Sequence, residues 1–305
     1  MADARRPVPR RILGVGIATL DVVNEVAAYP AEDDEIRALI QHRRRGGNVT
    51  NTLTLLRQFG HDCAWAGTLA EDAGSMEILR DLSRNGVGTR HCRRHGAGAT
   101  PTSYVTLSRE TGSRTIVHHR DLPEFTAADF ARISLAGYDW VHFEGRNPAE
   151  TASMLRDCAA RRPELPVSLE VEKPRDGIEG LFAGPRVLIF SRSYVQAGGY
   201  ADPRRFLEDQ WSQVSAELLL LPWGKDGSYA QARGGRPVFA PAHDPGAVID
   251  TLGAGDVFNA AVIDGLLAGA ELSAILARGN RIAGHKCALA GLDGVVPSAR
   301  AAGLL

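Results

Sequence analysis

Residues 250–256 read Asp-Thr-Leu-Gly-Ala-Gly-Asp and lead directly into the apolar stretch VFNAAVIDGLL at 257–267. Small residues at the point where a loop becomes a helix let the backbone approach a ligand closely. The first N–H groups of a helix have no partner within it, and the helix dipole adds positive potential there. This segment therefore predicts an anion site formed by Gly253, Ala254 and Gly255.

Asp256 places a carboxylate in the same turn as the predicted anion site. The pairing suits phosphoryl transfer, in which the backbone holds the transferred group and the carboxylate takes a proton from the attacking hydroxyl. A first-turn acid that only stabilises the helix dipole is the alternative, and the segment alone leaves both open. The run WGKDG at 223–227 is no Walker A motif, since it lacks the spacing and the Ser or Thr after Lys.

A second group of polar residues lies in the run Gly-Gly-Asn-Val-Thr-Asn at 46–51. Asn48 and Asn51 are three residues apart and share one face at the start of a predicted helix. Their carboxamides donate and accept, which suits a polyhydroxy ligand, although Asn48 could serve only as an N-cap. Asp21 is a third candidate because it follows the predicted strand 12–17, where open α/β sheets bind ligands. An exposed turn residue is the alternative for Asp21.

The chain alternates between predicted strands and helices over most of its length. This alternation is typical of a mainly parallel sheet covered on both faces, so we expect a three-layer α/β/α core. The predicted strands of the core are 12–17, 63–66, 140–143, 167–171, 187–190 and 217–221, and the predicted helices are 46–59, 74–85, 148–161, 203–215, 253–267 and 271–288.

Two pairs of short extended runs interrupt this rhythm: 22–28 with 36–42, and 102–107 with 114–119. Small sheets of this kind are marginal alone, so we expect a β-lid packed on the core, with a functionless edge elaboration as the alternative. The predicted division is an N-terminal tail of residues 1–11, an α/β core of residues 12–21, 46–98 and 122–305, and a β-lid of residues 22–45 and 99–121.

Composition excludes several classes of protein. The 305 residues are 44% hydrophobic, enough for one large core or two modest ones. Lys and Arg total 35 against 36 Asp and Glu, so the basic footprint of a nucleic-acid-binding protein is missing. We recognise no signal peptide and no apolar run near the roughly 20 residues of a membrane span. We therefore expect a cytoplasmic protein without nucleic-acid or membrane partners, and four widely spaced cysteines that stay reduced.

From about Ile12 to Val296, these segments together resemble the ribokinase/PfkB carbohydrate kinase family, whose two signatures match the Gly-Gly-Asn and DTLGAGD runs. The similarity is greatest to the ketohexokinase branch, whose members make fructose 1-phosphate. Other matching segments are LDVV (20–23), YPAEDDEIR (29–37), RRGGNVTN (44–51), GSRTIVHHRDLP (112–123), FEGRN (143–147), VEKPR (171–175) and AGHKCALAGLDGVV (283–296).

The resemblance implies a ribokinase-like fold and a role for each matching residue. Asp256 would be the base, and Gly253, Ala254 and Gly255 the anion hole for the transferred phosphoryl group. ATP, Mg²⁺ and possible K⁺ are the implied cofactors. The sugar would be held by Asp21, Gly47, Asn48 and Asn51. The nucleotide would be bound by Arg114, Gly224, Lys225, Asp226, Gly227 and Gly255. Asp250 would hold a monovalent cation, and Asp33 would reach the partner's sugar site in a homodimer.

One stretch departs from the family pattern. Many members carry an Asn-x-x-Glu run that organises the water shell of Mg²⁺, whereas residues 191–194 read Ser-Arg-Ser-Tyr. Ketohexokinases depart there too, so the stretch agrees with that branch and leaves the protein contacts of Mg²⁺ unassigned. Glu144, Glu170 and Glu172 are candidate substitutes, with charges at strand ends as the alternative.

We therefore expect an ATP-dependent sugar kinase that converts D-fructose to fructose 1-phosphate. A kinase for a sulfosugar, a pentose or a ketodeoxy sugar acid is the alternative, followed by a non-catalytic sugar or nucleotide sensor. A nicotinamide dehydrogenase is disfavoured because Thr19 stands where the fingerprint begun by Gly14 and Gly16 needs its third glycine. An acidic substrate needs a cation, for which the predicted lid offers Arg43, Arg44, Arg45, His118, His119 and Arg120, although solvated lid charges are the simpler interpretation.

The predicted lid also suggests an oligomer. Ile36, Ala38 and Ile40 alternate along the expected strand 36–42, so their side chains would share one apolar face. Such a face needs a second surface to cover it, and we expect a homodimer formed through the lids.

Overall fold

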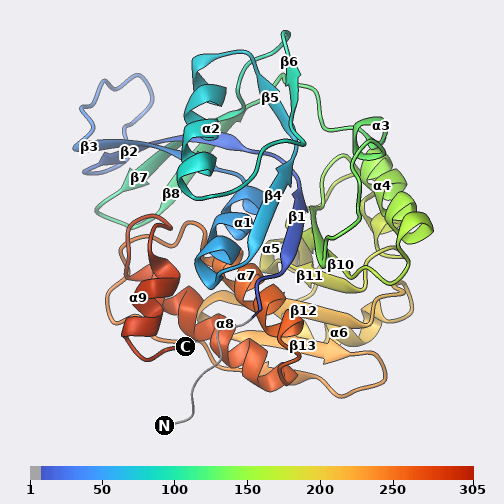
Figure 1. Ribbon diagram of the computed structural model, residues 1–305. Helices are drawn as coiled ribbons and strands as arrows, with labels where there is room; N and C mark the ends of the chain where they lie inside the picture. Colours follow the sequence, from blue (N-terminus) through green and yellow to red (C-terminus); the bar gives the residue numbers. More distant parts are fainter. Residues whose placement is uncertain (1–7) are drawn as a thin grey trace.

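A computed structural model describes residues 8–305 (Figure 1). Its centre is an eight-stranded sheet in the order β14-β13-β12-β11-β10-β9-β1-β4. In this order the neighbours from β12 across to β4 run parallel, and β13 and β14 pair antiparallel at one edge. These strands are β1 (Arg11–Val15), β4 (Asp62–Ala66), β9 (Trp140–Glu144), β10 (Val167–Val171), β11 (Val187–Phe190), β12 (Leu218–Pro222), β13 (Ser228–Ala232) and β14 (Val238–Ala240).

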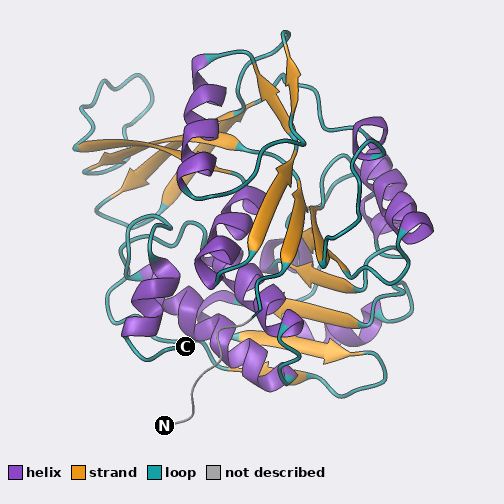
Figure 2. Ribbon diagram, in the orientation of Figure 1, coloured by secondary structure: helices purple, strands orange, loops and turns teal. Residues whose placement is uncertain are grey.

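Helices cover both faces of this sheet, which confirms the three-layer α/β/α expectation (Figure 2). Successive residues of β12 show why its sequence is apolar throughout: Leu218 and Leu220 join the core on one face, and Leu219 and Leu221 join the core on the other. One face carries α1 (Asn48–Phe59), α7 (Ala254–Leu267), α8 (Leu272–Cys287) and α9 (Val295–Ala301), and the other carries α3 (Ala127–Phe130), α4 (Pro148–Arg161), η1 (Ile178–Leu181), α5 (Arg192–Ala197) and α6 (Pro203–Gln210).

A separate four-stranded sheet, the lid, has the order β3-β2-β7-β8 and lies beside α2 (Ala73–Arg84). Its strands are β2 (Thr19–Val26), β3 (Ile40–Gly46), β7 (Thr102–Ser108) and β8 (Arg114–His119). A further pair, β5 (Thr68–Ala70) with β6 (Arg93–His95), was not expected from the sequence. The small sheet beside a mainly parallel core agrees with the predicted fold class.

The expected strand 36–42 is wrong in its bounds, since β3 begins only at Ile40. Ile36 and Ala38 precede it in an irregular segment, so the three apolar side chains do not form one strand face. The bounds of β3 could not be predicted from hydrophobic pattern because this strand reads Ile-Gln-His-Arg-Arg-Arg-Gly, which lacks apolar alternation. Its arginines instead pair with carboxylates of the core and of α2, as described below.

Other element ends differ by a few residues. The helix expected at 203–215 ends at Gln210, and the one expected from 46 begins at Asn48. Among residues 8–305 no helix is long and apolar enough to cross a membrane, and all four cysteines are free thiols. Residues 1–7 of the expected tail lie outside the described residues, and the division into core and lid stays a prediction.

Candidate active site

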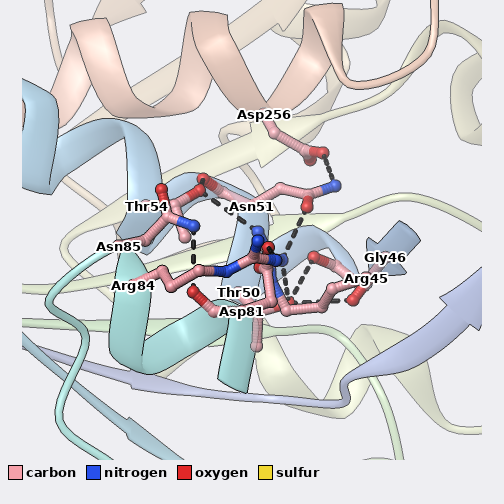
Figure 3. A network of polar contacts seen from close by, with 10 residues as sticks. Arg45, Gly46, Thr50, Asn51, Thr54, Asp81, Arg84, Asn85 and Asp256 are labelled. Carbon is pink, nitrogen blue, oxygen red and sulfur yellow. Dashed lines mark hydrogen bonds and ion pairs between the residues drawn. The ribbon is translucent and has the colours of Figure 1, made fainter. Parts of the chain in front are cut away.

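Asp256 and Asn51 meet between two helices of the core (Figure 3). Asp256 lies in the first turn of α7 and is 6% exposed, and Asn51 lies one turn into α1. The Asn51 amide nitrogen donates to Asp256 Oδ2 at 2.7 Å. A side chain from another helix thus fixes the orientation of the Asp256 carboxylate.

Arg45 continues this network from the lid into the core. Its guanidinium donates to Asn51 Oδ1 at 2.8 Å and to Asp81 Oδ2 of α2 at 2.6 Å, and its side chain is only 5% exposed. Because the Asn51 oxygen accepts from Arg45, its nitrogen is directed toward Asp256. The interpretation of Arg45 as a solvated lid charge is therefore wrong. The sequence did not reveal this because it cannot show which arginine of a run turns inward.

The electrostatic environment of Asp256 has opposing contributions. Burial raises the pKa of the Asp256 carboxyl well above its ordinary value, and the charges of Glu172 and Glu144 raise it further. The hydrogen bond from Asn51 and the charge of Arg45 act in the other direction. Removing either of them would therefore shift the carboxyl further toward its neutral form.

Glu170 is a second buried carboxyl close enough to Asp256 to feel its charge. It lies on β10 directly beside Glu144 on β9, and burial with the charges of Asp256, Glu172 and Glu144 raises its pKa well above the ordinary value. One of its carboxyl oxygens, Oε2, has no hydrogen-bond partner among the described residues. A side-chain hydrogen bond acts in the other direction on each of the two carboxyls, from Asn51 on Asp256 and from Asn48 on Glu170.

The acidic residues Glu144, Glu170 and Glu172 therefore gather at the carboxyl ends of two adjacent parallel strands. Within residues 8–305, no three acidic, His or Cys side chains converge closely enough to hold a metal ion by themselves. The unpartnered oxygen of Glu170 and the mutual repulsion of the carboxylates still fit a divalent cation nearby. An ion held chiefly by nucleotide phosphates, with these carboxylates around its waters, is compatible with both observations.

The N-terminus of α7 has the geometry expected of an anion hole. Gly253 is its N-cap with φ +84°, and a Cβ there would lie 2.9 Å from the Leu292 side chain, so glycine is required. A Cβ at Gly255 would meet no atom within 4 Å, so the space beside this residue of the first turn is open. The Ala254 N–H bonds the Thr251 carbonyl, whereas those of Gly255 and Asp256 have no carbonyl partner in the described chain.

The expected sugar residues lie where the lid meets α1. We expected Asp21 just after a core strand, but it lies within the lid strand β2. There it is 9% exposed and accepts a hydrogen bond from Thr19 Oγ1 at 2.9 Å. A Cβ at Gly46 would lie 2.3 Å from Asp21 Oδ2. Gly47, with φ +104°, is the N-cap of α1. Asn48 is therefore the first helical residue and not the N-cap, and it lies beside Glu170.

Two lid arginines contact the loop that precedes α7. Arg114 donates to Thr251 Oγ1 at 2.8 Å, which brings this expected nucleotide ligand beside the predicted anion hole. Arg44 Nη1 lies 3.0 Å from Asp250 Oδ2. The lid is thus joined to the DTLGAGD loop at two consecutive residues.

Asp250 does not fit the expected monovalent-cation site. The ammonium group of Lys286, a fully buried side chain, donates to the Asp250 carbonyl at 2.5 Å and lies 3.1 Å from its carboxylate. Despite burial, which raises it, the pKa of Asp250 falls to about 2, chiefly because of Arg44, with Lys286 contributing. Two fixed cations therefore pair with the oxygen atoms that a cation bound at Asp250 would need. Nothing local in the sequence indicates that Lys286 turns inward.

The expected nucleotide loop follows β12 as the short helix η2 (Gly224–Asp226). Gly227, with φ +104°, must be glycine because a Cβ would lie 2.3 Å from the Ala240 carbonyl oxygen. Asp226 pairs with Arg192 at 3.2 Å, and Lys225 is exposed. This loop follows the carboxyl end of β12, at the same edge of the sheet as Glu144, the last residue of β9, and Glu172, which follows β10.

Asp33 is not brought to the site by its own chain. It lies with φ +66° in the exposed loop between β2 and β3, which extends away from α7 (Figure 1). A role at a sugar site would require a second copy of the chain.

The family pattern of the pfkB family carbohydrate kinases matches residues 10–298, and the chain belongs to this family. It is an ATP-dependent sugar kinase with a ribokinase-like fold. Ketohexokinase from Mus musculus is 35% identical over 295 residues, which cover 94% of this chain and 99% of that protein.

Two further proteins are similar to this chain, one in sequence and one in fold. An ATP-dependent ribose-1-phosphate kinase from Halopiger xanaduensis is 27% identical over 83% of each chain. The structure of Arabidopsis thaliana ribokinase complexed with ribose and ATP has a TM-score of 0.77 at 19% identity, covering 95% of this chain and 96% of that one. The family is therefore established, while the sugar and the roles of individual residues stay predictions.

Proposed function

We propose that this protein is a ketohexose kinase that transfers the terminal phosphoryl group of ATP to the 1-hydroxyl of D-fructose. The observation that carries the proposal is the Asn51–Asp256 contact beside the open N-terminus of α7. It combines an oriented base with an anion hole in one turn of helix. The 35% identity to mouse ketohexokinase over nearly the whole chain supports fructose as the sugar.

In the proposed reaction, the sugar lies between the lid and α1, held by Asp21, Gly47, Asn48 and Asn51. The Asp256 carboxylate accepts the proton of the attacking hydroxyl as the bond to phosphorus forms. The N–H groups at Gly253, Ala254 and Gly255 stabilise the charge on the transferred group, for which that of Ala254 must leave the Thr251 carbonyl. Phosphoryl transfer depends mainly on positioning and charge stabilisation, so a base oriented by Asn51 is sufficient for the proton.

ATP is proposed to lie between the Gly224–Gly227 loop and the N-terminus of α7, with Lys225 and Asp226 at its edge and Arg114 near its phosphates. Mg²⁺, the general cofactor of the family, neutralises phosphate charge when bound. Glu144, Glu170 and Glu172 would hold its waters. Because Asp250 is already paired with Arg44 and Lys286, we propose no monovalent cation there.

We further propose a homodimer through the lid, in which Asp33 of one copy approaches the sugar site of the other. Several large apolar side chains of the lid are exposed in the single chain, which supports a covered surface. They are Ile36, Leu39, Ile40, Tyr104, Ile116 and Val117.

A coupled ADP-release assay across D-fructose, other ketohexoses, ribose and acidic sugars tests the proposal, with product positions determined by NMR. We expect the highest kcat/KM with a ketohexose and phosphorylation at its 1-hydroxyl. Preference for ribose would contradict the ketohexose assignment. Tight sugar binding without turnover of any sugar would favour a non-catalytic sensor.

A further inference from the structure

Polar side chains continue below the carboxyls of the candidate site, in the interior of the protein. His142 precedes Glu144 by two residues on β9, and Ser168 precedes Glu170 by two residues on β10. The strand register pairs His142 with Ser168 and Glu144 with Glu170, so the four side chains share one face of the sheet in two rows. The carboxyls form the upper row. His142 and Ser168 form the lower row, and neither has exposed surface.

Helix α1 packs against the same face of the sheet. A Cβ at Gly16 would lie 3.0 Å from Val49 Cβ, and a Cβ at Gly14 would lie 2.6 Å from Leu53 Cδ1. Four residues along α1 thus correspond to two residues along this strand, and Gly14 is the register partner of His142. The turn of α1 that contains Leu53 therefore lies at the level of the lower row.

Thr52 lies in this turn and points toward His142. The Asn48 side chain reaches β10, where it hydrogen-bonds with Glu170, whereas Val49 faces the end of β1. At 3.6 residues per turn, the Thr52 side chain leaves α1 in a direction between those of Asn48 and Val49, one turn further along the helix. Because β9 lies between β10 and β1 in the sheet, this direction leads to His142 on β9.

Hydrogen bonds in the lower row determine where the proton of His142 lies. The Trp140 Nε1–H donates to Ser168 Oγ at 2.8 Å, and His142 Nδ1 lies 2.8 Å from the same oxygen. Ser168 Oγ has no third partner among residues 8–305, so its O–H donates to His142 Nδ1. Burial lowers the pKa of His142 to about 4, and the neutral ring therefore carries its proton on Nε2.

Three buried polar atoms of this region lack a partner among the described residues. They are His142 Nε2, Thr52 Oγ1 and Glu170 Oε2, and none of the three residues is more than 7% exposed. Buried donors and acceptors that stay unpaired cost free energy. An N–H donor repels a metal cation and a carboxyl oxygen repels an anion, whereas water accepts from the first and donates to the second. Internal water typically makes about three hydrogen bonds to groups of this kind.

We propose that His142, Thr52 and Glu170 bind internal water, which donates a hydrogen bond to Glu170 Oε2. Thr52 and His142 are then positioning residues, because the water that they hold fixes the Glu170 carboxyl beside Asp256. This role rests on the proposed function, in which Asp256 is the base and Glu170 holds waters of Mg²⁺. No bond is made or broken at the internal water.

Crystal structures of the wild type, Thr52→Val and Thr52→Ser test the water site. Valine has the shape of threonine without its hydroxyl, and the serine variant is the matched control that keeps the hydroxyl. In the wild type and the control, we expect a water oxygen within about 3.2 Å of both His142 Nε2 and the hydroxyl at position 52. Thr52→Val should lose this water. A wild-type structure in which only protein atoms contact His142 Nε2 overturns the proposal.

The sign of the stability change in Thr52→Val is a second test. If water joins Thr52 to the lower row, the variant takes a partner from that water, and the melting temperature should fall by about 2 °C or more. If the row is dry, the same change removes an unpaired buried hydroxyl, and the melting temperature rises. A rise therefore overturns the proposal.

Kinetics test the positioning role. Thr52→Val and His142→Leu should each lower kcat about tenfold, with the sugar KM within about twofold of the wild type, and Thr52→Ser should keep its kcat. Two variants on different elements guard against misfolding of one of them. A Thr52→Val variant that loses the water and keeps its kcat overturns the positioning role. If the wild type phosphorylates no sugar, the proposed function is contradicted, while the crystal structures and melting temperatures still decide whether the water binds.

Discussion

The Asn51 amide on α1 donates to the Asp256 carboxylate on α7 at 2.7 Å across a separation of 205 residues. Arg45 of the lid fixes the other end of the same amide. The orientation of the proposed base is therefore set jointly by two core helices and one lid strand. Any change along this chain of contacts should alter how Asp256 takes a proton.

Asp256→Asn should lower kcat by about 10²–10⁴, the usual contribution of a general base. ATP affinity should stay within about twofold of the wild type, because the N–H groups of the α7 N-terminus are unchanged. Stopped assays for kcat and calorimetry for ATP binding measure the two quantities. Glu208→Gln, on the exposed face of α6, is the matched control, and a variant that keeps most of its rate would refute the role of Asp256 as base.

Asn51→Leu should shift the acid limb of the kcat/KM–pH profile to higher pH. The hydrogen bond from Asn51 favours the charged form of Asp256, so its loss raises the pKa of a carboxyl that burial has already raised. A higher pKa increases the protonated fraction of Asp256 at a given acidic pH. Because activity needs the carboxylate form, the rate at that pH falls. The profile is measured with saturating ATP, and Gln58→Leu on the same helix serves as control. An acid limb that does not move would show that Asn51 leaves the protonation of Asp256 unaffected.

Gly46→Ala should impair sugar binding through Asp21. The new Cβ would lie 2.3 Å from Asp21 Oδ2, so the carboxylate must move. We expect KM for the sugar to rise about tenfold, equivalent to about 1.4 kcal/mol, and stability to fall by about 1–3 kcal/mol from overpacking. Gly180→Ala, where a Cβ meets nothing within 4 Å, should leave both unchanged. An unaltered sugar KM in Gly46→Ala would argue against Asp21 as a sugar ligand.

Exchange of K⁺ for Na⁺ at constant ionic strength should change neither the rate nor the melting temperature by a measurable amount. Lys286 and Arg44 already pair with Asp250, so a monovalent cation finds no free ligand there. Lys286→Met should lower the melting temperature, since it removes one partner of a partly buried charge. Strong activation of the wild type by K⁺ would contradict this account of Asp250.

Several features were determined by the sequence itself. The apolar β12 run and the alternation of strands and helices predicted the three-layer core, because local patterns of hydrophobic residues reflect which faces are buried. The Gly253–Asp256 segment predicted an open helix end with a carboxylate in its first turn, because these properties depend on adjacent residues. Asn48 and Asn51 were placed on one helix face by their spacing.

Other features were decided only by the tertiary structure. Nothing local in the run at 43–45 distinguishes Arg45, which is buried against Asn51, from its exposed neighbour Arg43. Lys286 reads as a basic residue in the last turn of a helix, yet it is fully buried against Asp250. The ion-pair partners of Arg45 and Lys286, which are Asp81 and Asp250, each lie 36 residues away along the chain, and only folding brings them together. These side chains are buried because of ion pairs and not because they are hydrophobic. Ion pairs between distant residues leave no periodic pattern in the sequence, so the burial of Arg45 and Lys286 could not be predicted from it.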